Sequence, residues 1–205
     1  MRVAIVWGVA LALLLCAAAV AQAVSPPPAG PAPGCTDRRC HGGLTTRAHV
    51  HPPVKDADCT SCHQATQGSA HPDSSRVDFT LTATGGELCA QCHGAFDGGT
   101  QHPPAAGGDC LSCHDPHGSA IAKLLRRPVN ETCFECHEAK DFRVHALVGV
   151  DLGSGHPVSG AADPSRKGES LSCAGCHDPH ATDTPNLWKF GAQSTFDLCG
   201  NCHQK

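Results

Sequence analysis

Aromatic and thioether side chains are scarce in this 205-residue chain, which has no Tyr, six Phe, two Trp and one Met, at position 1. Gly and Pro, by contrast, number 22 and 16. Much of the 40% apolar fraction comes from Cys, from Ala and from one N-terminal run. The remaining apolar side chains are too few for an ordinary hydrophobic core. Disulfides, a metal or a covalent cofactor must therefore supply the missing stability.

An excess of basic residues is also missing, since the formal net charge is −4. This balance argues against nucleic acid as the main partner. After the N-terminal segment, the sequence has no further apolar run long enough to span a membrane.

The N-terminus has the pattern of a secretory signal peptide. Arg2 supplies a positive charge, residues 3–20 are almost wholly apolar, and Ala21-Gln22-Ala23 fits a small-residue cleavage site. We expect residues 1–23 to be removed, which leaves 14 Cys and a net charge of about −5. An uncleaved membrane anchor and a lipoprotein attached through Cys16 are alternatives, although the large Leu15 disfavours the second. The Pro-rich residues 24–34 predict a stiff, extended linker before residues 35–205.

The 14 remaining Cys form seven pairs, and His follows the second Cys of every pair. Six pairs have two residues between the thiols, and the first pair has four. The motifs are Cys35/Cys40/His41, Cys59/Cys62/His63, Cys89/Cys92/His93, Cys110/Cys113/His114, Cys133/Cys136/His137, Cys173/Cys176/His177 and Cys199/Cys202/His203.

This spacing fits the covalent attachment of haem c. Two thiols about one helical turn apart can add across the two vinyl groups of one haem, and the next His ligates the iron. Zinc sites also use Cys-x-x-Cys pairs, and exported disulfide scaffolds also have an even number of Cys. Neither requires a His after every second Cys. The motifs therefore predict about seven haems.

The second axial ligand of each iron is expected to be His. The single Met leaves with the signal peptide, and the chain has no Tyr. Eight His remain for seven irons, so the supply matches with one to spare; they are His49, His51, His71, His102, His117, His145, His156 and His180. Two His ligands and a polar surrounding predict low reduction potentials.

The motifs alternate between two types, which indicates an internal repeat. In type A, His-Pro precedes the first Cys, as at His51, His102 and His156. In type B, an acidic residue stands two positions before it, as at Glu87 and Glu131. We therefore predict three two-haem modules, 51–93, 102–137 and 156–203, in a quasi-linear array, with a further site at 35–41.

Two type A motifs continue as Asp-Pro-His, which places His117 three residues after His114 and His180 three residues after His177. A His at this distance cannot easily reach the opposite face of the same haem, so we expect it to ligate a neighbouring haem. Each module then brings two distal candidates, 51 and 71, 102 and 117, and 156 and 180. Of His49 and His145, one would serve the first haem and the other would be spare.

The Cys-x-x-Cys-His-Asp-Pro-His strings and the paired motifs resemble the doubled-CxxCH multihaem c-type cytochromes of exported electron-transfer systems in metal-respiring and other anaerobic bacteria. The resemblance covers residues 35–205. It implies a periplasmic or extracellular electron carrier whose partners are redox proteins, such as other cytochromes and quinol-oxidising or outer-membrane complexes. Because every iron has a His available, we expect no open haem and no substrate turnover.

Three other functions stay open. A multihaem reductase would need one haem with a free coordination position. A homo-oligomeric extracellular filament would use the spare His to ligate a haem of the next subunit. A membrane quinol dehydrogenase subunit would keep its N-terminal segment uncleaved.

The expected fold is mostly irregular, with short helical turns at the motifs and a core made of haem. Longer helices are predicted over residues 119–127 and 131–145, and a weak strand over 80–84. The few Phe and Trp side chains are expected to pack against the haems.

Overall fold

The computed structural model describes residues 34–38, 40–68, 71, 78–137, 144–145 and 156–203, and of 144–145 the backbone alone. The predicted signal peptide and nearly all of the predicted linker lie outside these residues. Within the described ranges, no helix is both long enough and apolar enough to cross a membrane.

Short elements alternate with loops and turns, as the sequence predicts. The α-helices are α1 (Pro52–Lys55), α2 (Gly85–Ala90), α3 (Pro103–Ala106), α4 (Val129–Phe134), α5 (Cys173–Cys176) and α6 (Thr195–Gly200). Single 3-10 turns are η1 (Gly42–Leu44), η2 (Cys110–Ser112), η3 (Ala122–Leu124) and η4 (Pro185–Leu187). The strands are β1 (His49–Val50), β2 (His63–Ala65), β3 (Phe79–Leu81), β4 (Thr100–Gln101), β5 (Gly118–Ser119), β6 (Val144–His145), β7 (His156–Pro157) and β8 (Ala181–Thr182).

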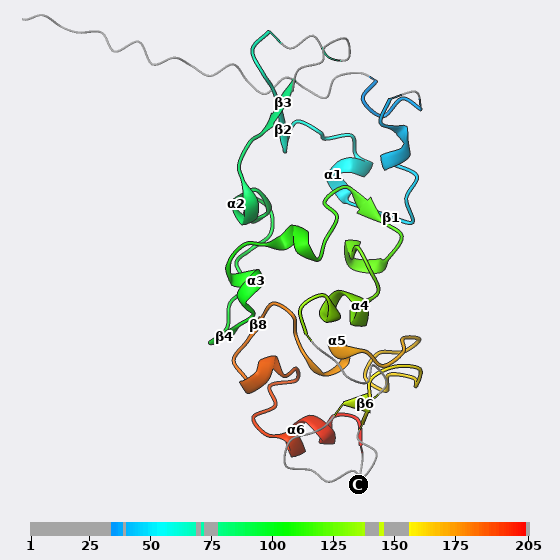
Figure 1. Cartoon of the computed structure of the whole chain (residues 1–205), viewed down its shortest axis with the longest axis vertical. Coiled ribbons are helices and arrows are strands. Elements are labelled where there is room, and N and C mark those ends of the chain that lie inside the picture. The colour runs from blue at the N-terminus through cyan, green and yellow to red at the C-terminus, as the bar shows by residue number, and fades with distance from the viewer. Residues whose placement is uncertain are drawn as a thin grey trace, which may run out of the picture.

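Successive modules follow one another along the long axis of the molecule (Figure 1). The first motifs lie at one end, α2 to α4 occupy the middle, and α5 and α6 lie at the other end. Two of the four two-stranded antiparallel sheets join one module to the next, because β1 pairs with β5 and β4 pairs with β8. The other two sheets pair strands that are nearer in sequence, β2 with β3 and β6 with β7.

The His-Pro-Pro segments explain how these inter-module sheets end. A residue before Pro favours extended backbone, and Pro suits the first position of a helix because it has no N–H to leave unpaired. His51 and His102 are extended, and the Pro residues after them begin α1 and α3. The N–H of His51 donates to the carbonyl of His117 at 3.1 Å, and that of His102 donates to His180 at 2.9 Å. Each His-Pro-Pro is thereby fixed to the Asp-Pro-His of the following module.

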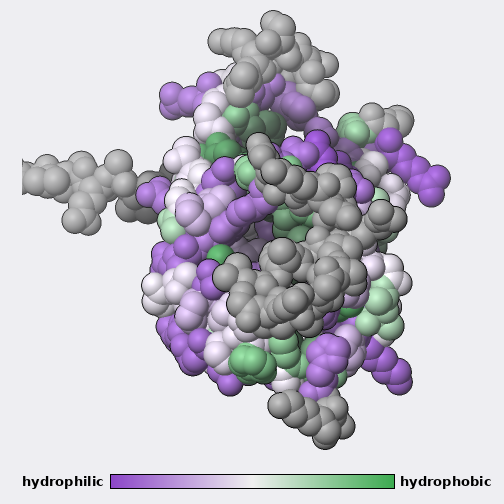
Figure 2. All heavy atoms as spheres, turned by 60° about the horizontal axis from the view of Figure 1, so that its bottom comes forward, coloured by the Kyte–Doolittle hydropathy of each residue, from purple (hydrophilic) through white to green (hydrophobic). Residues whose placement is uncertain are grey.

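The protein part of the molecule has almost no hydrophobic core. Among the described residues, Ala192 and Leu198 are the apolar side chains that are buried, with 2% and 8% of their surface exposed. Large apolar side chains remain at the surface, and Figure 2 shows them scattered among hydrophilic residues. Apolar burial, which ordinarily dominates folding, therefore contributes little between protein segments here.

Two of the predicted helices are wrong. Residues 119–127 begin in β5 and continue into η3, where Lys123 and Leu124 have positive φ values of 61° and 58°, which a right-handed α-helix does not allow. The helix predicted over 131–145 ends at Phe134, and residues 144–145 form β6. The strand predicted over 80–84 is present but covers Phe79–Leu81. Apolar spacing suggested helices here, but the pairing of segments distant in sequence decides the backbone.

Gly98 offers a test of the joint between the second and third modules. A Cβ at this position would lie 2.7 to 2.8 Å from backbone atoms of Thr182 in β8. We expect Gly98→Ala to lower the free energy of unfolding by about 1–3 kcal/mol, because neither backbone can move freely. The thermal unfolding midpoint of the haem-loaded protein measures this. Gly94→Ala is the control, since nothing lies within 4 Å of its added Cβ, and equal midpoints in the two variants would contradict the expectation.

Candidate haem sites

Twelve histidine rings face one another in six pairs. Their ring centres are 6.0 to 6.1 Å apart, and each pair joins one His that follows a Cys pair to one of the other eight. The pairs are His41–His71, His63–His117, His93–His51, His114–His180, His137–His102 and His203–His156. Five pairs are within 9° to 19° of parallel, and the sixth, His156–His203, is at 87°.

This separation fits two imidazoles that ligate one iron from opposite sides. A metal–nitrogen bond of about 2.0 Å, with the ring centre roughly 1 Å behind the nitrogen, puts the ring centres about 6 Å apart. Within the part of the chain that the structure describes, no three His, Cys, Asp or Glu side chains gather closely enough to hold a bare ion. The ring pairs thus match the two axial positions of a haem.

Hydrogen bonds fix the ring tautomer at four histidines. Nδ1 of His114 lies 2.9 Å from the carbonyl oxygen of Lys123, and Nδ1 of His177 lies 2.7 Å from that of Asn186. Nδ1 of His102 and of His156 contact the carbonyls of Pro179 and Pro157 at 2.9 and 2.8 Å. Because a carbonyl oxygen only accepts, Nδ1 carries the proton, and Nε2 keeps the lone pair that a metal requires.

Two strained turns supply the carbonyls for His114 and His177. Lys123 and Leu124 have positive φ, and Asn186 and Leu187, in the corresponding turn of the third module, have φ of 54° and 58°. Such conformations are costly for residues other than Gly. A backbone hydrogen bond also joins the segment after each turn to the second Cys of the motif. Arg126 N–H donates to Cys113 O, and Lys189 N–H donates to Cys176 O, both at 2.9 Å. In the first module the hairpin β2–β3 takes this place, and Thr82 N–H donates to Cys62 O.

The Asp of each Asp-Pro-His string orients the His that follows it. Asp115 accepts the backbone N–H of His117 at 3.0 Å, and its carboxylate lies 3.9 Å from Nδ1 of the same residue. Asp178 stands in the same relation to His180, at 2.9 and 3.5 Å. Burial lowers the pKa of His117 and of His180, which outweighs the opposite effect of the neighbouring carboxylates. Both rings therefore stay neutral at neutral pH, as metal ligation needs.

Thiols of successive motifs lie beside one another in chain order. First-Cys thiols are within hydrogen-bond reach at Cys35–Cys59, Cys89–Cys110 and Cys133–Cys173. Second-Cys thiols are also neighbours, at Cys62–Cys92, Cys113–Cys136 and Cys176–Cys202. Burial raises the pKa of Cys62, Cys113 and Cys176, and the nearby second thiol adds to the increase. No disulfide joins any of these 14 Cys. The seven motifs thus form one continuous row.

The stretched first motif departs from the others at Cys40. In five of the regular motifs the N–H of the second Cys donates to the carbonyl of the first, whereas the Cys40 N–H donates to Asp37 O at 2.9 Å. The His41 N–H still donates to Cys35 O at 3.1 Å, as the corresponding His does elsewhere. The two additional residues therefore keep the His in its usual relation to the first Cys. Cys40 is exposed at the surface, as are Cys92 and Cys136 of the regular motifs.

The row needs close approach of backbones where modules meet. A Cβ on Gly86, at the start of α2, would lie 2.7 Å from Cα of Gly108, which precedes η2. At the corresponding position before α5, Asn130 of α4 uses its side chain instead. Its Oδ1 accepts the Cys173 N–H at 2.8 Å, and its Nδ2 donates to Val158 O at 2.9 Å.

The thiols of Cys133 and Cys173 are hydrogen-bonded to each other. This hydrogen bond raises the pKa of Cys133 and lowers the pKa of Cys173 to about 7.

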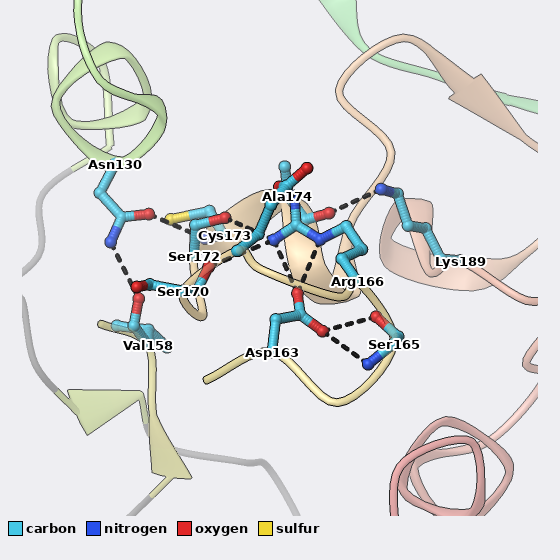
Figure 3. A network of polar contacts seen from close by, with 11 residues as sticks. Asn130, Val158, Asp163, Ser165, Arg166, Ser170, Ser172, Cys173, Ala174 and Lys189 are labelled. Carbon is cyan, nitrogen blue, oxygen red and sulfur yellow. Dashed lines mark hydrogen bonds and ion pairs between the residues drawn. The ribbon is translucent and has the colours of Figure 1, made fainter. Parts of the chain in front are cut away.

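A buried ion pair supports the sixth motif (Figure 3). The Asp163 side chain is 1% exposed and accepts hydrogen bonds from Arg166 at 2.7 Å and from the Ser165 hydroxyl at 2.6 Å. Arg166 also donates to Ser172 Oγ at 3.0 Å, directly before α5. Gly175 within α5 packs on this carboxylate, since a Cβ there would lie 3.0 Å from Asp163 Oδ2. The pair therefore determines where the sixth motif sits.

In the first two modules, the ring opposite the His of the type A motif comes from the following module. His117 faces His63 rather than His114, and His180 faces His114 rather than His177. Type B motifs instead receive a ring from their own module, as His93 does from His51. The expectation that His49 or His145 faces the first motif is wrong, because the ring opposite His41 is that of His71. His71 occupies this place because the first module has Thr66 where the others have the His of Asp-Pro-His.

Two distal candidates lie outside the six pairs. His49 is exposed on β1, opposite Ser119 of β5. The backbone of His145 lies in β6 directly opposite His156 of β7, and its side chain lies outside the described residues.

Several supporting residues escaped the sequence analysis. The two left-handed turns carry no Gly, which is the usual signal for positive φ. Phe96, which is among the aromatic residues expected to pack against the haems, stacks on His180 with ring centres 4.2 Å apart and planes at 6°; the sequence does not indicate this ring contact. The repeated Asp of Asp-Pro-His was visible in the sequence and could have been given its orienting role.

Comparison with known proteins supports the pattern of motifs. The family model described as "Doubled CXXCH motif" matches residues 51–98, 102–142 and 163–205. The chain belongs to the doubled CXXCH motif family. It is a multihaem c-type cytochrome, and the matched doubled motifs support covalently bound haem c with iron. The six regular motifs lie within the matched residues, whereas the first pair, Cys35 and Cys40, lies outside them.

A curated relative of this doubled CXXCH chain is "Multiheme cytochrome MtrA" of Shewanella baltica (strain OS185). The two are 33% identical over 91 residues, which is 42% of this chain. The matched region spans a quarter of the relative's own length, at 25%.

Asp163 makes the third module sensitive to acid. Burial alone would raise the pKa of Asp163, but hydrogen bonds from Ser165 and Arg166 and the charge of Arg166 hold it below its ordinary value. A carboxyl whose pKa is depressed in the folded state stabilises the fold above its unfolded pKa, and this contribution is lost as the pH falls through its folded pKa. We expect Asp163→Asn to cost about 3 kcal/mol at pH 7 and to flatten the fall in thermal midpoint below about pH 4.

The matched control is Glu169→Gln, which removes the other carboxylate on Arg166. The Glu169 side chain is 60% exposed, so its loss should cost less than about 1 kcal/mol. Thermal midpoints across the pH range compare the two variants, and equal losses at pH 7 would refute the role given to Asp163.

Proposed function

We propose that this chain is an exported electron-transfer protein that holds seven covalently attached haems in a row. The two Cys of each motif would form the thioether bonds, and the adjacent His would be the first axial ligand. Each haem iron supplies one-electron redox chemistry when bound. The observation that carries the proposal is the set of six opposed ring pairs at 6.0 to 6.1 Å, which would provide a second His ligand for six of the seven irons.

Attachment of a haem at the stretched motif is part of this proposal. Its support is the ring of His41, which faces His71 at the same 6.0 Å as the regular pairs. The exposed thiol of Cys40 would form the second thioether bond there, at the edge of the row.

The thiol contacts support a single path for electrons. Each motif has its neighbours in sequence as its neighbours in space, from His41 through His63, His93, His114, His137 and His177 to His203. Haems attached to adjacent thiols would lie close together, which transfer by hopping requires. Exposed apolar side chains such as Phe79, Leu81 and Leu111 are available to cover the haem faces.

His145 is proposed as the second ligand of the iron at His177, and His49 as the surplus His. Strand β6 places His145 opposite His156, whose ring faces His203 of the seventh motif. The sixth and seventh motifs are neighbours through Cys176 and Cys202. His49 instead lies on β1 beside β5, near the His63–His117 pair, where each ring already has an opposite.

The chain's own groups would keep these sites at low potential. Met raises haem potentials as a ligand, and the chain has Met only at position 1. Carbonyl oxygens on Nδ1 make the ligating imidazoles more electron-rich, which stabilises ferric iron. We propose periplasmic or extracellular redox proteins as partners and electron carriage without substrate turnover.

The haem count is directly measurable. We expect the mature protein to weigh as the chain without residues 1–23 plus seven haems, with low-spin signals alone in the electron paramagnetic resonance (EPR) spectrum. Fewer than six haems would contradict the proposal. A high-spin signal in the native protein would favour a reductase instead.

Replacing the two unpaired histidines separates their roles. We expect His145→Ala to open one iron, so that the reduced protein binds about one equivalent of carbon monoxide per chain, because the vacated position is free. His49→Ala is the matched control and should bind none. Absorbance titration measures both, and carbon monoxide binding by His49→Ala would reverse the assignment.

A further inference from the structure

One of the six ring pairs differs from the rest in orientation. The rings of His156 and His203 are at 87°, whereas the other five pairs lie between 9° and 19°. The separation of the ring centres is the same, at 6.1 Å, as for His102 and His137. The two pairs are therefore matched in position within their modules and differ in rotation.

A change of hydrogen-bond acceptor accounts for the rotation. His102 precedes α3, its backbone N–H donates to His180 of the next module, and its Nδ1 contacts Pro179 O of that module. His156 lies in β7 instead, and its Nδ1 contacts the carbonyl of its own neighbour, Pro157, at 2.8 Å. An imidazole bonded to the next residue of its own segment faces a different direction from one bonded to a segment of another module, and its Nε2 side turns with it.

We propose that Pro157 O and β7 hold His156 perpendicular to His203, so that the haem between them is electronically distinct from the haems between parallel rings. This inference rests on the proposed function, since it requires both rings to ligate one iron.

The reason lies in the iron d orbitals. Iron has two π-type d orbitals, and each imidazole raises the energy of the one that overlaps with its own π system. Parallel rings raise the same orbital, which separates the two orbitals in energy and gives a rhombic low-spin ferric spectrum. Perpendicular rings raise both orbitals nearly equally, which leaves much orbital angular momentum and produces a signal at large g. With perpendicular rings, the ferric state also loses the stabilisation that the energy separation of the two orbitals provides, so the reduction potential of the haem becomes more positive.

The more positive reduction potential would make this haem the first in the row to be reduced. Because the haem between His156 and His203 would be that of the seventh motif, an electron that enters the row would settle at that site before the others with parallel rings. A single carbonyl contact in β7 would then bias the direction of transfer along a chain whose other described ring pairs are alike.

The test is the EPR spectrum of the oxidised, haem-loaded full chain, with each low-spin component quantified. We expect one large-g component with an intensity of one haem per chain in addition to the rhombic signals. His156→Ala should lose that component and gain an equal high-spin signal. His102→Ala, the matched control in the second module, should lose one rhombic component and keep the large-g signal.

Spectra that are rhombic throughout, or a large-g signal that survives in His156→Ala, would overturn the inference while leaving seven low-spin haems and the proposed function intact. Too few haems by mass would instead overturn the proposed function. Reduction of the wild-type protein in steps provides a second readout. The large-g signal should disappear at a more positive potential than the component that His102→Ala removes, and the reverse order would overturn the redox bias.

Discussion

Imidazole rings that approach each other from separate segments are the contacts on which the arrangement of this chain depends. Each lies opposite a ring that the sequence places well away, and the two ring centres are held at 6.0 to 6.1 Å. Apolar burial between protein segments cannot impose this order, because Ala192 and Leu198 are nearly all that is buried among the described apolar side chains. The short inter-module sheets, the strained turns and the Asp-Pro-His carboxylates all act to bring rings to these positions.

The backbone accepts unfavourable conformations where they orient a ring. Lys123 and Asn186 adopt positive φ without being Gly, and their carbonyls contact Nδ1 of the proximal His in the second and third modules. Strain of this kind persists when the surroundings over-determine it. Here the motif and the segment after the turn are also joined by backbone hydrogen bonds, such as Asp115 N–H to Leu124 O at 2.8 Å. The same solution in both modules shows that the geometry belongs to the repeat.

The sequence predicted the chemistry of the sites better than their backbone. Covalent chemistry requires Cys and His at fixed spacing, so the motifs and the alternation of two types were readable from residues alone. The position of His117 three residues after His114 was enough to predict that it serves another motif, and its ring faces His63. The helix predicted over 119–127 failed because β5 pairs with a strand about 70 residues earlier. Local sequence patterns do not predict that pairing, and they do not predict that His71 lies opposite His41.

The rule by which rings are shared has a consequence for how such chains change in length. In the first two modules, the His of the type A motif faces a ring from the Asp-Pro-His string of the following module, and the His of every type B motif faces the ring of the His-Pro of its own module. The joint therefore has the same form wherever it recurs, as the β1–β5 and β4–β8 pairings show. Gene duplication can thus lengthen or shorten such a chain in whole modules, while a partial module would leave a motif His without a ring opposite it.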